Sequence, residues 1–127
     1  MALAWAKAEL DDVAEAAQVV KQALTRLYAD TYRRALANAL RVHALVAARQ
    51  GCWGMATEAL EEGLALAQAM PYPYAAARLL QVAGVLHAQQ GEPGLARERL
   101  EAALALFRQL GADKDTDQAQ QAIVDLQ

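Results

Sequence analysis

The sequence has 127 residues, a formal net charge of −3 and a single cysteine, Cys52, which suit one compact domain and exclude a disulfide framework. Hydrophobic residues make up 56% of the chain, but 32 of them are alanine, which favours closely packed helices over a membrane protein. No apolar run reaches the roughly 20 residues that a membrane-spanning helix needs. Charged residues interrupt the N-terminal segment too early for a signal peptide, so we expect a cytoplasmic protein.

The N-terminal part of the chain predicts two short helices. Residues 2–10 form the first. Asp12 followed by Glu15 resembles a capping box, in which two side chains close the start of a helix, so the second helix should run from there to about Ala29.

Further breaks divide the rest of the chain, because proline, glycine and short polar residues end or restart helices. They lie at Asp30, Thr31, Pro71, Pro73 and Gly111. Asp115 or Thr116 should cap a final helix with a polar outer face, in which Ala119, Ala122, Ile123 and Leu126 are the buried candidates.

Two stretches of the chain, Gly51–Met70 and Gly91–Leu110, match each other at a distance of forty residues. The identical pairs include Gly51/Gly91, Gly54/Gly94, Ala56/Ala96, Glu58/Glu98, Leu60/Leu100, Glu61/Glu101, Leu64/Leu104, Ala65/Ala105 and Leu66/Leu106. A period of about 20 to 50 residues is the signature of a stacked-repeat architecture. With the same shift of forty residues, Ala16, Val20 and Leu24 align with Ala56, Leu60 and Leu64, which indicates a degenerate first repeat.

Each full copy predicts a helix, a Gly-x-x-Gly turn and a second helix. Gly51 and Gly91 stand where a helix ends in a left-handed residue, and Pro93 suits the first position of the next helix. The apolar stripe of that second helix consists of Leu95, Ala96, Leu100, Ala103, Leu104 and Phe107. One hairpin alone cannot bury such a stripe, so neighbouring hairpins should stack.

The order of small and large residues resembles the tetratricopeptide repeat (TPR). The residues that carry the resemblance are Ala44 and Gly84 at the centre of the first helix, Gly51 and Gly91 at the turn, and Ala56/Ala96, Leu60/Leu100 and Gly63/Ala103 in the second helix. The forty-residue period exceeds the family's usual length of about 34. Long-helix variants of this kind look like the repeat regions of LuxR-type transcription regulators and signal-transduction ATPases.

The resemblance implies an all-α fold of antiparallel helical hairpins stacked as an α-solenoid, with about six to seven helices. As one helical-repeat domain over residues 1–127, the chain would comprise a degenerate repeat (1–29), two full repeats (30–70 and 71–111) and a capping helix (112–127). The short first repeat fits either a piece of a longer array or an abbreviated natural start.

The sequence carries no convincing catalytic or metal site. His43 and His87 lie on consecutive first helices that carry no carboxylate, so we expect them to be packed and hydrogen-bonded between helices rather than to share a metal or proton-transfer site. DKDTD at 113–117 lacks the glycine and glutamate of a calcium loop. The Gly-x-x-Gly turns repeat with the period and have no strands around them, which favours structural turns over an RNA-clamping loop. Without a P-loop, H-E-x-x-H or nucleophile elbow, we expect no enzyme, metal or cofactor.

The charges are unevenly distributed between the two kinds of helix. The first helices of the repeats carry arginine but no Asp or Glu, whereas the second helices are rich in Glu. In the family that the chain resembles, the first helices line the concave surface. By register, the predicted groove residues are Asn38, Arg41, Leu45, Arg49, Arg78, Gln81, Val85 and Gln89. Tyr32, Tyr72 and Tyr74 lie at one rim, where they either contact a ligand or cover helix ends.

Three hypotheses follow. The first is a non-catalytic protein-protein interaction module, the regulatory or sensor segment of a larger bacterial signalling or transcription protein, whose basic groove binds an acidic peptide or protein segment through forked arginine donors. The second is a scaffold that forms homodimers through open stack ends. The third is a sensor of a small anionic ligand. An acidic chain without a basic recognition helix does not favour direct binding of nucleic acid.

Overall fold

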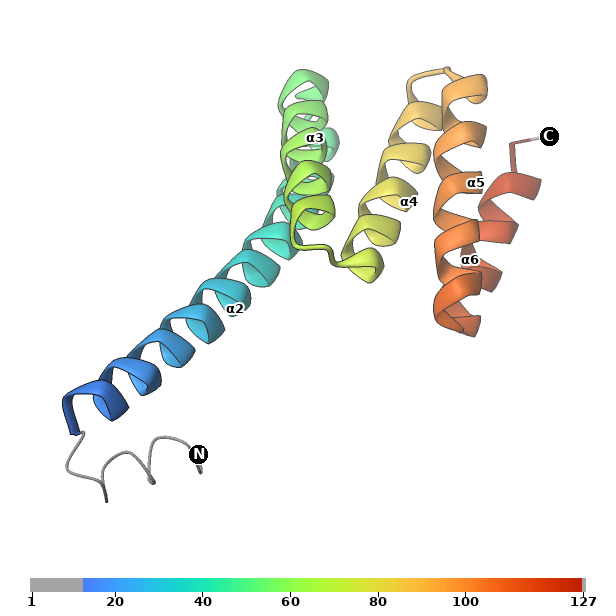
Figure 1. Ribbon diagram of the computed structural model, residues 1–127. Helices are drawn as coiled ribbons and strands as arrows, with labels where there is room; N and C mark the ends of the chain where they lie inside the picture. The colour runs from blue at the N-terminus through green and yellow to red at the C-terminus, as the bar shows by residue number, and fades with distance from the viewer. Residues whose placement is uncertain (1–12, 127) are drawn as a thin grey trace. The chain divides into compact units, whose positions relative to one another are not determined.

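The computed structural model describes residues 13–126, with side chains from residue 17 onward. Every regular element in this range is an α-helix (Figure 1). The helices are α2 (Val13–Arg49), α3 (Trp53–Ala69), α4 (Pro73–Gln89), α5 (Pro93–Leu110) and α6 (Asp113–Val124). The all-helical class predicted from the sequence is therefore confirmed for this part of the chain. The predicted helix at 2–10 and the capping box at Asp12 lie outside the described residues.

The predicted break at Asp30 and Thr31 is wrong, because α2 continues through both residues from Val13 to Arg49. No glycine or proline lies within α2, and a single aspartate or threonine costs a helix interior only about 0.7 kcal/mol or less. The backbone nevertheless divides into two compact units, with the division inside this helix between Tyr32 and Arg33. The predicted repeat boundaries themselves stay predictions.

Three glycines end helices in the left-handed conformation, which the sequence predicts for Gly51 and Gly91; for Gly111 it predicts only the end of a helix. Gly51, Gly91 and Gly111 have φ angles of 78°, 77° and 69°. After Gly51, the Cys52 backbone N–H donates to the Ala47 carbonyl oxygen over 2.8 Å, which satisfies one of the free carbonyls at the end of α2. The same bond recurs forty residues later, from Glu92 to His87. The local turn chemistry of the repeat is thus confirmed.

Proline begins two of the helices. Pro73 opens α4 and Pro93 opens α5, in both cases at a position where the missing N–H costs nothing. The final helix departs from the prediction, because it begins at Asp113 rather than at Asp115 or Thr116, and its N-cap residue, Ala112, offers no side-chain hydrogen bond. The acidic residues lie instead in the first turn, where the helix dipole favours negative charge.

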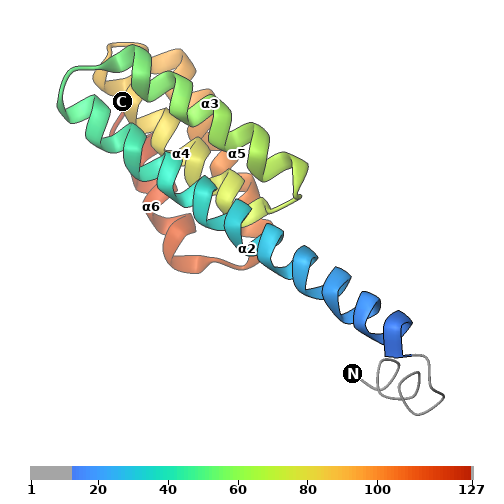
Figure 2. The same cartoon turned by 90° about the vertical axis from the view of Figure 1, so that its left-hand side faces the viewer.

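The second unit, from Arg33 onward, holds two neighbouring apolar clusters. The first joins α3 and α4 to the C-terminal part of α2, and its members include Ala44, Ala59, Leu60 and Leu79. The second joins α4, α5 and α6, the helices drawn in yellow to red in Figure 2. It surrounds Phe107, which is fully buried. Each helix from α3 to α6 packs against the next in the chain.

Candidate functional site

A cavity of about 250 Å³ lies within the second unit, between α2 and α4. Only these helices and the residue before α4 line it. The lining residues are Arg34, Ala37, Asn38, Arg41, Tyr72, Tyr74, Ala75, Arg78 and Leu79. Three of them carry a positive charge and none carries a negative charge. We call this space the arginine cavity.

Arg41 is the most constrained of the three arginines. Its Nη2 donates a hydrogen bond of 3.0 Å to Asn38 Oδ1, one turn earlier on α2. Its Nε is shut off from solvent and has no hydrogen-bond partner among the described residues. Burial and, second, the positive charge of Arg78 lower the pKa of Arg41, while the interaction with Tyr74 opposes them. The guanidinium still stays protonated at any physiological pH, so its positive charge is held without compensation.

Two tyrosine rings hold the other two arginines. The Cζ atom of Arg34 lies 4.9 Å from the ring centroid of Tyr72, and that of Arg78 lies 5.8 Å from the ring centroid of Tyr74. Both distances are within the range of cation–π attraction. Stacking leaves the edges of a guanidinium, where its N–H groups lie, free to donate to a ligand.

Tyr74 is fixed from its other side. Its ring meets that of Phe107 edge to face at a centroid distance of 6.0 Å, and its hydroxyl group donates to Asp115 Oδ2 over 2.9 Å. This hydrogen bond, and burial to a lesser extent, raise the pKa of the Tyr74 phenol. The phenol is therefore neutral at physiological pH and adds no negative charge to the arginine cavity.

The first turn of α4 adds a second positive element to the cavity wall. Tyr72, Tyr74 and Ala75 line the cavity, and Tyr72 makes no side-chain hydrogen bond that would cap the helix. The first N–H groups of a helix have no intrahelical partners and carry the positive end of its dipole. Together, three guanidinium groups and one helix start make this cavity suited to an anion.

The eight predicted groove residues separate into distinct places. Asn38, Arg41 and Arg78 meet at the arginine cavity. Val85 and Gln89 line another cavity, with Leu100 of α5, Ala122 of α6 and the two residues that follow α6. Leu45 packs against the first apolar cluster. Arg49 is exposed and Gln81 half-buried, and neither lines the arginine cavity.

Sequence reasoning left six lining residues of the arginine cavity out of the predicted groove, and three of them, Arg34, Tyr72 and Tyr74, contribute a charge or an aromatic ring. Arg34 was recognisable, because it precedes Asn38 by four residues and Arg41 by seven and so shares one face of α2 with them. Tyr72 and Tyr74 were placed at a rim, and the structure gives them a role as supports of Arg34 and Arg78. In the forty-residue register Arg34 corresponds to Tyr74, so the repeat alignment hides its contribution.

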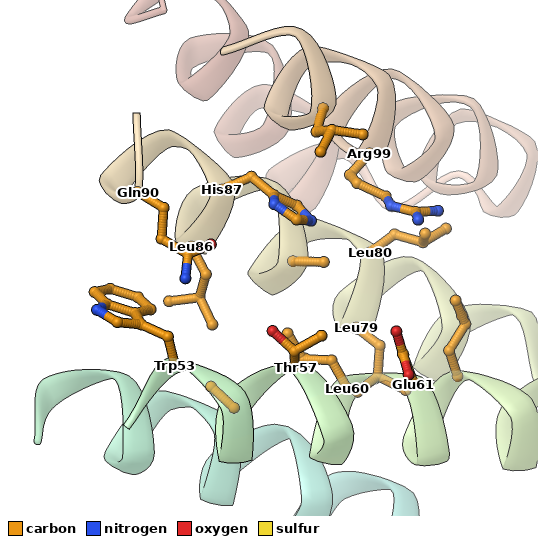
Figure 3. Close-up of a pocket in the computed structure, with 14 residues that line it drawn as sticks. Trp53, Thr57, Leu60, Glu61, Leu79, Leu80, Leu86, His87, Gln90 and Arg99 are labelled. Atoms are coloured by element: carbon orange, nitrogen blue, oxygen red, sulfur yellow. The ribbon is translucent and has the colours of Figure 1, made fainter. Parts of the chain in front are cut away.

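A second cavity, of about 160 Å³, lies between α3, α4 and α5 and has a different character. Trp53, Leu60, Leu79, Leu80 and Leu86 give it a largely apolar wall, with Arg99 and His87 at its side (Figure 3). His87 Nδ1 lies 3.2 Å from Glu92 Oε1, so this histidine has a partner. The space lacks the concentration of unpaired charge found in the arginine cavity.

The two histidines do not form a common site. His43 is exposed, so the expectation that it is packed between helices is wrong, and it lies beside Met55 and Glu58 rather than near His87. Within residues 13–126, no three His, Cys, Asp or Glu side chains are grouped closely enough to hold a metal ion.

Comparisons were made with protein-family models, curated proteins and solved structures. None of them matches this chain. No described helix combines the length and apolar character required to cross a membrane.

Proposed function

We propose that this protein is a non-catalytic interaction module, built of TPR-like hairpins stacked as an α-solenoid, that binds an acidic peptide or protein segment. The observation that carries the proposal is that Arg41 and Arg78 line one cavity without an acidic side chain beside them. Forked guanidinium donors pair well with carboxylates, and such charge-assisted bonds are roughly twice as strong as neutral ones. The resemblance of the repeat favours a role as the regulatory segment of a larger signalling or transcription protein.

The arrangement supports binding of a segment rather than catalysis. The cavity offers donors and positive charge, but its lining residues include no nucleophile with an adjacent base and no pair of carboxylates. The arginines lie on the wall between two helices, where an extended chain can pass over them and insert one acidic side chain.

The test compares two charge-reversed variants of the full chain. The first, Arg41→Glu with Arg78→Glu, removes two cavity arginines; the control, Arg26→Glu with Arg33→Glu, changes the net charge equally at exposed positions of α2. The probe is a fluorescein-labelled peptide of alternating glutamate and serine, with a glutamine copy as reference. Fluorescence anisotropy should show binding of the glutamate peptide that the first variant loses and the control retains. If both variants lose peptide binding equally, net charge alone would explain the binding, and the proposal would be wrong.

A homo-oligomeric scaffold is a second candidate, which the exposed face of α2 favours. Leu24, Leu27 and Tyr28 are 45%, 60% and 69% exposed. In the forty-residue register, Leu24 and Leu27 correspond to Leu64 and Ala67 of α3, which pack in the core. Light scattering over a wide concentration range tests this candidate. A monomer throughout would exclude it, and a dimer that Leu24→Lys with Leu27→Lys dissociates would support it.

A further inference from the structure

The charge balance of the arginine cavity indicates which acidic group it fits. Arg34, Arg41 and Arg78 supply three positive charges, and no ion pair joins any of them to an acidic residue in residues 17–126. A carboxylate would neutralise one of these charges. A phosphate monoester carries about −1.5 to −2 at neutral pH and has three acceptor oxygens, so it matches the cluster better.

The size of the cavity agrees with this choice. Its volume of about 250 Å³ compares with about 30 Å³ for one water molecule in the liquid. A phosphate group therefore fits in the cavity together with several water molecules. The first turn of α4 borders the cavity through Tyr74 and Ala75, and the positive end of the helix dipole there favours a negatively charged group.

Arg41 provides an independent reason to expect a strongly charged ligand. A buried donor without a hydrogen-bond partner, such as its Nε, is unfavourable until a ligand or another group accepts from it. A small rotation of the guanidinium toward a phosphate oxygen would give Nε a partner, while Asn38 Oδ1 holds the other side of the group. An anion in the cavity would also relieve the repulsion between Arg41 and Arg78 that contributes to the lowered pKa of Arg41.

We propose that the arginine cavity is a binding site for a phosphate monoester, held by the guanidinium groups of Arg34, Arg41 and Arg78 beside the first turn of α4. This inference rests on the proposed function, since it assigns the acidic group that the same site accepts. The phosphate has two chemical sources, a phosphorylated side chain of a peptide and a small phosphorylated molecule. The phenol of Tyr74, already bonded to Asp115, orients Arg78 and does not bind the ligand.

The test uses three peptides of one sequence, with serine, glutamate or phosphoserine at the centre, titrated into the full chain by calorimetry at constant ionic strength. The phosphoserine peptide should bind about tenfold more tightly than the glutamate peptide, and the serine peptide more weakly than both. Equal affinity of the phosphoserine and glutamate peptides would overturn the phosphate inference and leave the proposed function standing. Absence of binding by both would overturn the inference and the proposed function together.

Free O-phosphoserine and inorganic phosphate distinguish the two sources. If both free ligands bind at least tenfold more weakly than the phosphoserine peptide, the source of the phosphate is a peptide, and both proposals are supported. If free O-phosphoserine binds as tightly as the phosphoserine peptide, the phosphate site is supported, but binding of a peptide segment, as the proposed function states, is contradicted. Arg34→Gln, Arg41→Gln and Arg78→Gln should each weaken phosphate binding severalfold, whereas Arg33→Gln, outside the cavity, should not. An equal effect of Arg33→Gln would reject the site.

Discussion

The Tyr74 hydroxyl group donates a hydrogen bond of 2.9 Å to Asp115 Oδ2 and so joins the first turn of α4 to the first turn of α6. The ring of the same tyrosine lies under the guanidinium of Arg78. The final helix thereby fixes one wall of the arginine cavity, although none of its own residues lines that cavity.

This hydrogen bond should contribute measurably to stability. Tyr74→Phe keeps the ring but removes the donor, and Asp115→Asn weakens the acceptor. We expect each variant to lower the free energy of unfolding by about 1 kcal/mol, with the double variant little worse than either, because the bond is lost only once. Urea unfolding of all four proteins gives the coupling energy. Additive losses would show that the two side chains do not interact.

Tyr74 should also titrate at unusually high pH. Its phenol has a raised pKa, chiefly because it donates to Asp115, so the folded state retains this proton after the unfolded state has lost it. The stabilisation from neutral Tyr74 is fully present below the ordinary tyrosine pKa of about 10 and is lost as pH rises from there toward the folded value. Phenolate absorbance during alkaline titration should contain a late component that disappears in Tyr74→Phe. An unchanged titration curve would contradict the assignment.

Gly84 should resist substitution more than any other helical glycine in the described part of the chain. A Cβ atom there would lie 2.6 Å from Leu100 Cγ and 3.1 Å from the Ala96 carbonyl oxygen, where α4 approaches α5. The helix-propensity gain of alanine, about 1 kcal/mol, is outweighed by overpacking of about 1 to 3 kcal/mol, so Gly84→Ala should lower the melting temperature.

Gly54 provides the matched control for Gly84. It lies in the first turn of α3, and a Cβ atom added there would have no neighbouring atom within 4 Å, so alanine meets open space. Gly54→Ala should therefore be neutral or stabilising by about 0.5 kcal/mol. A melting temperature of Gly84→Ala equal to that of Gly54→Ala would contradict the close helix contact.

Replacement of Arg41 should abolish binding of the acidic peptide without lowering the stability of the fold. Arg41→Met keeps a long side chain but removes the unpartnered Nε and the repulsion from Arg78. We expect unchanged or higher resistance to urea together with loss of acidic-peptide binding, the trade-off typical of a functional site. The matched variant Arg33→Met, at an exposed position on the same helix, should keep the binding. Clear destabilisation by Arg41→Met would indicate a structural role for this arginine instead.

Local chemistry made much of the fold readable from the sequence. Gly51, Gly91 and Gly111 end helices because only glycine adopts a positive φ without strain, and Pro73 and Pro93 begin helices for equally local reasons. Asp30 misled the prediction because short polar residues favour helix starts without forbidding helix interiors. The final helix begins early for a related reason, since an acidic first turn does not need a side-chain cap.

The candidate site was only partly readable. Helical register brought Asn38, Arg41 and Arg78 together correctly on facing helices. The separation of Val85 and Gln89 into another cavity follows from how α4 packs against α5 and α6, which depends on long-range contacts. The contribution of Tyr74 likewise depends on Asp115, which lies 41 residues away in the sequence.

The most direct measurement of the central claim follows the Nε–H resonances of the arginines by nuclear magnetic resonance while the acidic peptide is added. The Nε–H signals of Arg34, Arg41 and Arg78 should shift together and saturate at one peptide concentration, because the three groups line one cavity. The Nε–H signals of Arg26 and Arg33 should not shift. Shifts confined to those exposed arginines, or no shift at Arg41, would contradict the assignment of the arginine cavity as the binding site.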